Sequence, residues 1–328
     1  MADNPITKSC IVQDPILNNM TQSPHSALIT LLGPTASGKT KLAVSLAKKL
    51  TGEIISADSR QVYRGMDIGT GKDLDEYQGI PYHLIDIIDP DQEYNLFEFS
   101  TGFCRCFQEI QERNALPFLV GGTGMYLDSV LNRYKLTIAE PDKNTRLLLE
   151  KKSDDELRAI LLTLNPNQHN ETDLQDRKRL LQAIYVAKSV HQSSPELVWP
   201  TFSQLIIGIK IPREETRRRI TSRLQARFDE GMIDEVERLY KNGISWEKLD
   251  FFGLEYRFIA QHLKGELNYN DMFQKLNSAI HYFAKQQEKW FRKMERSGLK
   301  IHWLEQNEQL FDNAHQLIQP FITKNSQS

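Results

Sequence analysis

The sequence contains few of the residues that build a disulfide framework or a zinc centre. Its 328 residues include only three cysteines, Cys10, Cys104 and Cys106. Cys104 and Cys106 lie two positions apart in a predicted helix, and no second pair of metal-ligating residues accompanies them. We therefore expect a cytoplasmic protein with reduced thiols and without structural zinc.

Long apolar segments are also missing from the chain. No run approaches the ~20 apolar residues that a helix needs to cross a bilayer. The N-terminus lacks a basic start followed by an apolar core, so we expect no secretion signal. These absences predict a protein without membrane association, and we further expect a monomer.

Neither sign of charge dominates the composition. Lys and Arg number 41 against 43 Asp and Glu, for a net charge of −2 at pH 7. This balance argues against a general nucleic-acid binder, but acidic residues prevail in 53–98 and basic residues in 210–227 and 285–296. A solvated charged face explains most of these basic residues, and a local phosphate-binding surface stays open as an alternative.

The order of apolar runs indicates the fold class. Runs of strand length lie at 27–32, 53–57, 83–88, 117–120, 204–211 and 300–304. Helical periodicity marks 39–50 and 95–115, then 145–152, 154–164 and 176–190 without an intervening strand. Strands that alternate with helices predict an α/β protein with a P-loop NTPase-like parallel sheet core flanked by helices. The all-helical stretch predicts an insertion domain within it.

These elements divide the chain into three predicted parts. They are a flexible N-terminal extension at 1–26, an α/β catalytic core at 27–139 and 200–328, and a helical insertion at 140–199.

A glycine-rich motif follows the first predicted strand. Its residues fit G-x-x-x-x-G-K-[ST] in full and predict a diphosphate-binding loop: Gly33, Pro34, Thr35, Ala36, Ser37, Gly38, Lys39 and Thr40. Backbone amides and the helix N-terminus form a cradle for anionic oxygens. Lys39 adds a cation, and the Thr40 hydroxyl is a candidate ligand for Mg²⁺. The motif does not specify ATP, so a nucleotide hydrolase, a small-molecule kinase and a transferase using another diphosphate all stay open.

Other strand ends carry polar residues that belong to the same edge of a parallel sheet. Asp58 follows the second strand, and Thr123 lies in the glycine-rich end of the fourth. The strand at 204–211 leads through Pro212 to Arg213, with Arg219 on the following helix. Asp58 is a candidate magnesium ligand or general base, and a helix cap or turn is an equally good interpretation.

Several motifs together resemble the tRNA dimethylallyltransferase family. The glycine-rich loop and the block Ile55–Thr70 carry the resemblance, and its most specific element is Asp58–Thr70. The similarity runs from about Ala27 to Arg296. Further matches are His83-Leu84-Ile85-Asp86, Val120-Gly121-Gly122-Thr123-Gly124-Met125-Tyr126, Asp176-Arg177-Lys178-Arg179, Ala284-Lys285 and Trp290-Phe291-Arg292.

The resemblance implies a reaction and a set of site residues. Dimethylallyl diphosphate would bind with Mg²⁺ at Thr35, Lys39, Thr40, Arg213 and Arg219. Its prenyl group would pass to N6 of the adenosine 3′-adjacent to the tRNA anticodon. Asp58 would accept the N6 proton, and Asp58, Thr35 and Arg213 would form the catalytic set. The implied tRNA-binding residues are Asp58, Ser59, Arg60, Gln61, Thr123, Arg177, Lys178, Arg179, Tyr256, Arg257 and Lys285.

The sequence departs from the family pattern on the side expected to meet RNA. Arginine is expected where Gln182, His281 and Gln286 stand, and glycine where Glu255 stands. Fewer phosphate contacts weaken RNA binding and reduce its salt dependence. Three other readings therefore stay open: transfer to a free adenine nucleotide, a small-molecule kinase that binds ATP, and a catalytically silent RNA-binding protein.

Overall fold

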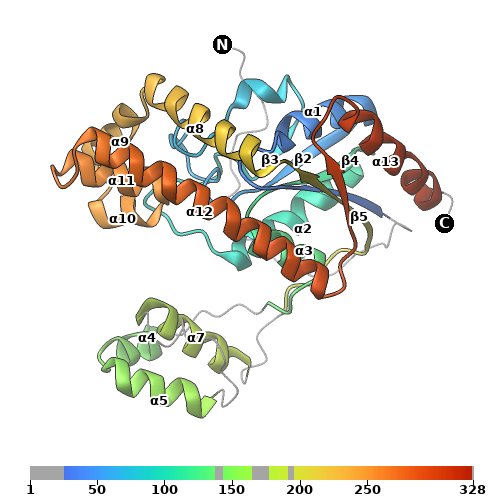
Figure 1. Ribbon diagram of the computed structural model, residues 1–328. Coiled ribbons are helices and arrows are strands. Elements are labelled where there is room, and N and C mark those ends of the chain that lie inside the picture. Colours follow the sequence, from blue (N-terminus) through green and yellow to red (C-terminus); the bar gives the residue numbers. More distant parts are fainter. Residues whose placement is uncertain (1–25, 137–142, 165–176, 191–195, 327–328) are drawn as a thin grey trace.

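A six-stranded, fully parallel sheet forms the centre of the computed structural model (Figure 1). The structure describes residues 26–136, 143–164, 177–190 and 196–326. The strand order is β3-β2-β4-β1-β5-β6. The strands are β1 (Ser26–Leu32), β2 (Gly52–Ala57), β3 (Tyr82–His83), β4 (Leu116–Gly121), β5 (Phe202–Lys210) and β6 (Ile301–Glu305). Every neighbouring pair is parallel, so all the strand ends that the sequence singled out share one edge.

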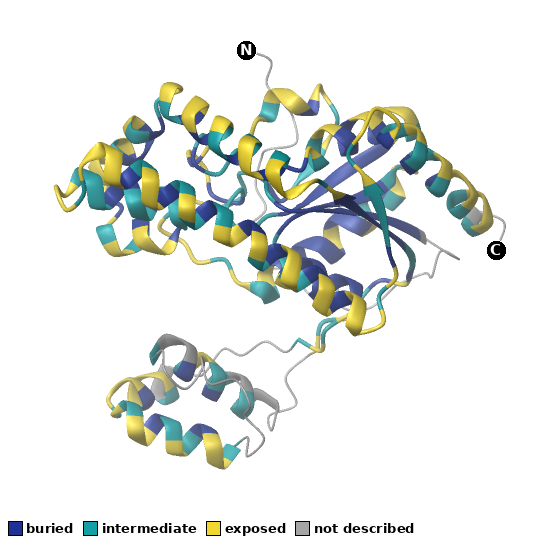
Figure 2. Ribbon diagram, in the orientation of Figure 1, coloured by how far each residue is buried: buried dark blue, intermediate teal, exposed yellow. Residues whose placement is uncertain are grey.

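Helices cover both faces of this sheet. On one face, α1 (Lys39–Leu50) and α13 (Leu310–Ser326) bury leucines and alanines against β1 and β5. On the other face lie α2 (Leu96–Glu112), α3 (Gly124–Leu131) and the end of α12 (Tyr269–Arg296), which contributes Phe291 and Met294. Figure 2 shows this layering: the strands are mostly buried (dark blue), and the helices around them carry exposed residues (yellow). The predicted α/β class is confirmed.

A second group of helices packs beside the carboxyl edge of the sheet. It comprises α8 (Arg213–Asp229), α9 (Met232–Lys241), α10 (Trp246–Phe251), α11 (Leu254–Leu263) and the first half of α12. These helices share a core with Val62, Tyr63 and Met66, which come from the loop after β2. The sequence predicts helices from Arg213 to Arg296, and the structure confirms them.

The insertion consists of α4 (Lys143–Glu150), α5 (Asp154–Leu164) and α7 (Arg177–Val190), with a core of its own. Leu157, Leu161, Leu180 and Ile184 are buried in that core. In Figure 1 the three helices stand apart from the sheet. The flexible extension is predicted at 1–26, and its residues 1–25 lie outside the described part of the chain. Its last residue, Ser26, begins β1.

The strand predicted at 83–88 is wrong beyond His83. In this part of the chain, strand pairing with β2 is limited to Tyr82–His83. The short 3-10 helix η1 (Leu74–Tyr77) precedes this strand. Leu84 and Asp86 adopt positive φ angles of 61° and 55°, which are incompatible with a continuing strand. The buried Lys72 ammonium binds the Asp86 carboxylate there, a contact across 14 residues that periodicity does not reveal.

Across the described ranges, no helix is long and apolar enough to cross a membrane.

Candidate active site

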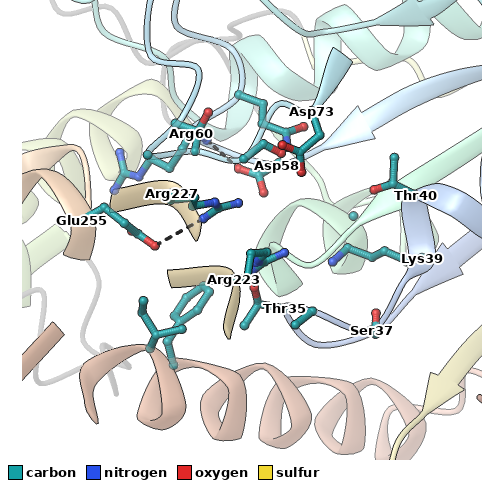
Figure 3. A pocket seen from close by; sticks show the side chains of 18 of the residues that line it. Thr35, Ser37, Lys39, Thr40, Asp58, Arg60, Asp73, Arg223, Arg227 and Glu255 are labelled. Atoms are coloured by element: carbon teal, nitrogen blue, oxygen red, sulfur yellow. Dashed lines mark hydrogen bonds and ion pairs between the residues drawn. The ribbon is translucent and has the colours of Figure 1, made fainter. Parts of the chain in front are cut away.

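The loops after β1, β2 and β4 open into one cavity of about 710 Å³ (Figure 3). The P-loop contributes Thr35 through Thr40, and the loop after β2 contributes Asp58 through Gln61. Gly121 at the end of β4 and Thr123 just after it also line the cavity. The helices α8, α11 and α12 and the segment from Gly69 to Tyr77 line its other sides. Polar groups from these chain segments therefore face a common volume, which is large enough for a small ligand and part of a second one.

The P-loop geometry suits an anion. Gly38 takes a φ of 78°, where a side chain would be strained, and α1 begins at the next residue. No acidic residue lies in the first turn of α1, so no carboxylate competes for its free amides. Gly33 and Pro34 are buried beneath the loop and do not line the cavity. The loop therefore offers a positive, preorganised cradle.

Lys39 is the cation at the centre of this cradle. Its Nζ donates to the Pro34 carbonyl at 3.4 Å. Burial and then the charge of Arg223 lower the pKa of Lys39 to about 8, against the opposing effect of Asp58. A bound diphosphate would satisfy this ammonium, because its oxygens would bring negative charge close to Nζ.

Arg223, which the sequence reasoning missed, joins the P-loop from α8. Its Nη2 donates to the Thr35 hydroxyl. Burial first, and then Arg227, lowers the pKa of Arg223 to about 10. The signal was present in the sequence, because Arg223 follows Arg219 by four residues and helical residues at that spacing share a face. Both side chains line the cavity.

Gln287 on α12 is a second residue that sequence reasoning missed. Its Oε1 accepts from the Thr35 backbone N–H at 2.8 Å, and its Nε2 donates to the Gly122 carbonyl at 2.9 Å. The side chain is only 7% exposed. The Gln287 side-chain amide thus ties the P-loop to the end of β4. A Cβ atom on Gly122 would lie only 2.5 Å from Gln287 Nε2, so this contact requires glycine at position 122.

Asp58 lies opposite the P-loop in the same cavity. Its Oδ1 accepts from the Arg60 backbone N–H at 2.9 Å, which fixes the carboxylate at the start of the turn. The Thr123 hydroxyl accepts from the Ser59 N–H at 3.2 Å. The Gln61 side chain spans the same turn, since its amide contacts Ser56 and the Gly71 carbonyl. Figure 3 shows Asp58 between Lys39 and the pair formed by Arg227 and Glu255.

Some predicted site residues lie elsewhere. Arg213 is exposed at the first position of α8 and does not line the cavity, whereas Arg219 does. Tyr256 borders the cavity, but its hydroxyl donates to the buried Glu235 carboxylate at 2.8 Å. Arg257 binds Asp250 at 2.6 Å, and Lys285 is exposed on α12 outside the cavity.

The predicted insertion residues begin α7. Arg177 donates to the Asp154 carboxylate and to the carbonyls of Glu150 and Lys152, at 2.8 Å for each carbonyl. It therefore joins α7 to α5 within the insertion. The side chains of Lys178 and Arg179 lie outside the described residues.

Glu255, at a position where the resemblance predicts glycine, faces Arg227 inside the cavity. Its Oε1 lies 4.0 Å from Arg227 Nη1. Burial raises the pKa of the Glu255 carboxyl, and Arg227 opposes that rise. The carboxylate therefore enters the cavity with a partner, so it does not present an isolated negative charge to RNA.

The residues present fit a magnesium ion held mainly by its substrate. Thr40, Asp58 and Asp73 line the cavity beside the P-loop. Within the described ranges, no group of three or more His, Cys, Asp or Glu side chains forms a protein-only metal cage. Mg²⁺ characteristically takes one or two protein ligands together with phosphate oxygens and waters, which this arrangement allows.

Comparison with known proteins identifies the family. A family model described as IPP transferase matches residues 61–294, and one described as isopentenyl transferase matches residues 26–80. The chain belongs to the IPP transferase family. A family member from Geotalea uraniireducens, named tRNA dimethylallyltransferase 1, is 59% identical over 278 residues, which is 85% of this chain and 92% of that protein.

Solved structures place the fold in the same family. The tRNA isopentenylpyrophosphate transferase from Bacillus halodurans has a TM-score of 0.66 at 33% identity, over 92% of this chain and 96% of its own. A structure titled as eukaryotic dimethylallyltransferase acting on tRNA has a TM-score of 0.72 at 24% identity, over 86% and 74% of the two chains, and shows the shared fold. The resemblance to the tRNA dimethylallyltransferases is confirmed.

Proposed function

We propose that this IPP transferase moves a dimethylallyl group from dimethylallyl diphosphate to N6 of an adenosine in tRNA. The acceptor we propose is position 37, 3′-adjacent to the anticodon, and the product is N6-dimethylallyladenosine. The observation that supports this proposal is that Asp58 and the P-loop lysine line one cavity. Relatives at 59% and 55% identity are named tRNA dimethylallyltransferases.

The diphosphate end of the cavity would hold the donor. Lys39, Thr40, Arg219 and Arg223 would bind its oxygens together with the P-loop amides. As the allylic C–O bond breaks, negative charge accumulates on the leaving diphosphate. Each well-placed donor stabilises such a transition state by about 3 kcal/mol. Mg²⁺, when bound near Thr40, would neutralise part of the same charge. We assign this role to Arg219 and Arg223, because Arg213 does not line the cavity.

The other end would hold the adenine. Its exocyclic amine is a weak nucleophile because the lone pair is delocalised into the ring. The new N6–C bond forms as the C–O bond breaks, and the surplus N6 proton passes to the Asp58 carboxylate. A general base of this kind contributes about 10²–10⁴ in rate. An anticodon-loop base is already unpaired, so it leaves its stack at low cost.

The test is a transfer assay with purified protein, Mg²⁺, labelled dimethylallyl diphosphate and tRNA. We expect label on tRNA, with kcat lowered about 10²–10⁴-fold by Asp58→Asn and RNA affinity retained. Asp89→Asn, at an exposed carboxylate that binds Arg64 at 2.9 Å, is the matched control. Label on free AMP but not on tRNA would instead support a nucleotide prenyltransferase, and phosphate transfer from ATP would support a kinase. Nucleosides from cells with and without the gene, compared by mass spectrometry, would identify the modified position.

A further inference from the structure

Two consecutive rings on α12 stand out among the exposed aromatic side chains. Tyr282 is 64% exposed and Phe283 is 45% exposed. Other exposed tyrosines are packed on neighbouring rings: Tyr240 stacks on Trp246 at 3.8 Å, and Tyr269 meets Phe228 at 5.6 Å. Within the described residues, Tyr282 and Phe283 pack against no aromatic ring. Exposing two adjacent large rings has no evident benefit for the fold.

The position of these rings relates them to the cavity. Phe283 lines it together with Ile280 and Gln287, which lie three and four residues away on the same helical face. Tyr282, the preceding residue, projects about 100° further around the helix, where it is exposed and does not line the cavity. Exposed single apolar residues are ordinary on protein surfaces, whereas an exposed ring that borders a ligand cavity is characteristic of a contact site.

The charges around the rings indicate what kind of ligand fits. Lys285 and Lys289 are exposed further along α12 and can meet a phosphate backbone. Beside the rings, however, Gln286 is neutral, and burial together with Arg217 lowers the pKa of His281, which disfavours its charged form. Aromatic rings flanked by scattered cations are typical of proteins that bind single-stranded nucleic acid by stacking.

We propose that Phe283 and Tyr282 are stacking platforms for unpaired bases of the RNA acceptor that flank the target adenosine. Phe283 takes the base next to the cavity, and Tyr282 takes the one further out. The proposal rests on the RNA acceptor of the proposed function and adds how that RNA is held.

The experiment measures the affinity of an RNA hairpin that carries the anticodon loop, over a series of salt concentrations. We expect Phe283→Ala and Tyr282→Ala each to weaken binding about 10-fold, the order found for the loss of one stacked base. The slope of log affinity against log salt stays unchanged. Lys285→Ala should lower that slope instead, because it removes a phosphate contact. Tyr240→Ala, at an exposed tyrosine on α9 away from the cavity, serves as the matched control and should bind like the unmodified protein.

Conservative variants and altered RNA separate stacking from packing. Phe283→Trp and Tyr282→Phe should keep full affinity, whereas Phe283→Leu should not. An RNA with an abasic residue beside the target adenosine should bind the wild-type protein weakly. Its affinity for the Phe283→Ala variant should be no lower than its affinity for the wild-type protein. The inference is overturned if that variant and the abasic RNA weaken binding independently, or if Phe283→Ala binds the intact RNA normally. If the unmodified protein transfers no prenyl group to RNA at all, the proposed function fails instead.

Discussion

Lys39 is the residue whose charge state couples this site to pH. Its pKa of about 8 means that the unliganded protein carries the ammonium below pH 8 and loses it above. We expect affinity for inorganic pyrophosphate with Mg²⁺ to fall as the pH rises through about 8, because the neutral amine no longer attracts the anion. Isothermal titration calorimetry over a pH series checks this, and Lys39→Met, measured identically, corrects for the protonation of pyrophosphate itself. An equal slope in both proteins would contradict the prediction.

The same shift has the opposite sign for stability. The unfolded chain binds the lysine proton more tightly than the folded one, so this group makes the unliganded fold more stable as the pH rises above about 8.

Gln287 gives a prediction for the P-loop anchor. Gln287→Leu keeps the volume but leaves the Thr35 N–H and the Gly122 carbonyl without their partner. We expect a loss of about 1–3 kcal/mol in the free energy of unfolding, and weaker donor binding because the P-loop loses its tie to β4. Urea denaturation and the KM for the diphosphate measure the two effects.

The neighbouring residue supplies a control for that experiment. Gln286 Nε2 is buried with no hydrogen-bond partner in the described part of the chain. Gln286→Leu should therefore leave the free energy of unfolding unchanged or raise it. A loss equal to that of Gln287→Leu would show that the hydrogen bonds are not the cause.

At the scale of elements, one carboxylate fixes the loop beside the cavity. Glu235 on α9 accepts from the N–H groups of Asp67, Ile68 and Gly69 at 2.8, 2.7 and 3.0 Å. It also accepts from the Tyr256 hydroxyl at 2.8 Å. We expect Glu235→Ala to lower the free energy of unfolding by about 3 kcal/mol or more, because buried donors lose a charged partner.

Tyr256→Phe removes a single member of that set and should cost about 1 kcal/mol. Chemical denaturation of both variants gives the comparison. If the two losses were equal, the tyrosine would be the main partner and the loop amides would contribute nothing.

At the scale of the whole molecule, the three helices of the insertion pack around a core separate from that of the sheet. The chain leaves and returns side by side, since Leu197 N–H donates to the Leu136 carbonyl at 2.9 Å. We propose that the insertion clamps the tRNA.

Replacing residues 137–195 with a short Gly/Ser linker tests that role. We expect the shortened protein to fold and bind pyrophosphate normally, and to bind tRNA about 10-fold or more weakly, with a smaller salt slope because phosphate contacts are lost. Unchanged tRNA affinity would show that the insertion does not hold the tRNA. Loss of pyrophosphate binding would show that the insertion supports the core.

The sequence by itself determined the sheet class, the P-loop and the placement of Asp58 and Thr123 at one sheet edge. These features follow from local rules: apolar runs, strand–helix alternation and the fixed spacing of a phosphate-binding loop. Tertiary structure alone decided that Arg223 and Gln287 reach the P-loop from positions 188 and 252 residues away from Thr35. It also decided that Arg213 does not line the cavity and that the strand predicted at 83–88 stops after His83. The physical reason is that helix packing sets which side chain enters a cavity, and no local pattern encodes the angle at which two distant helices meet.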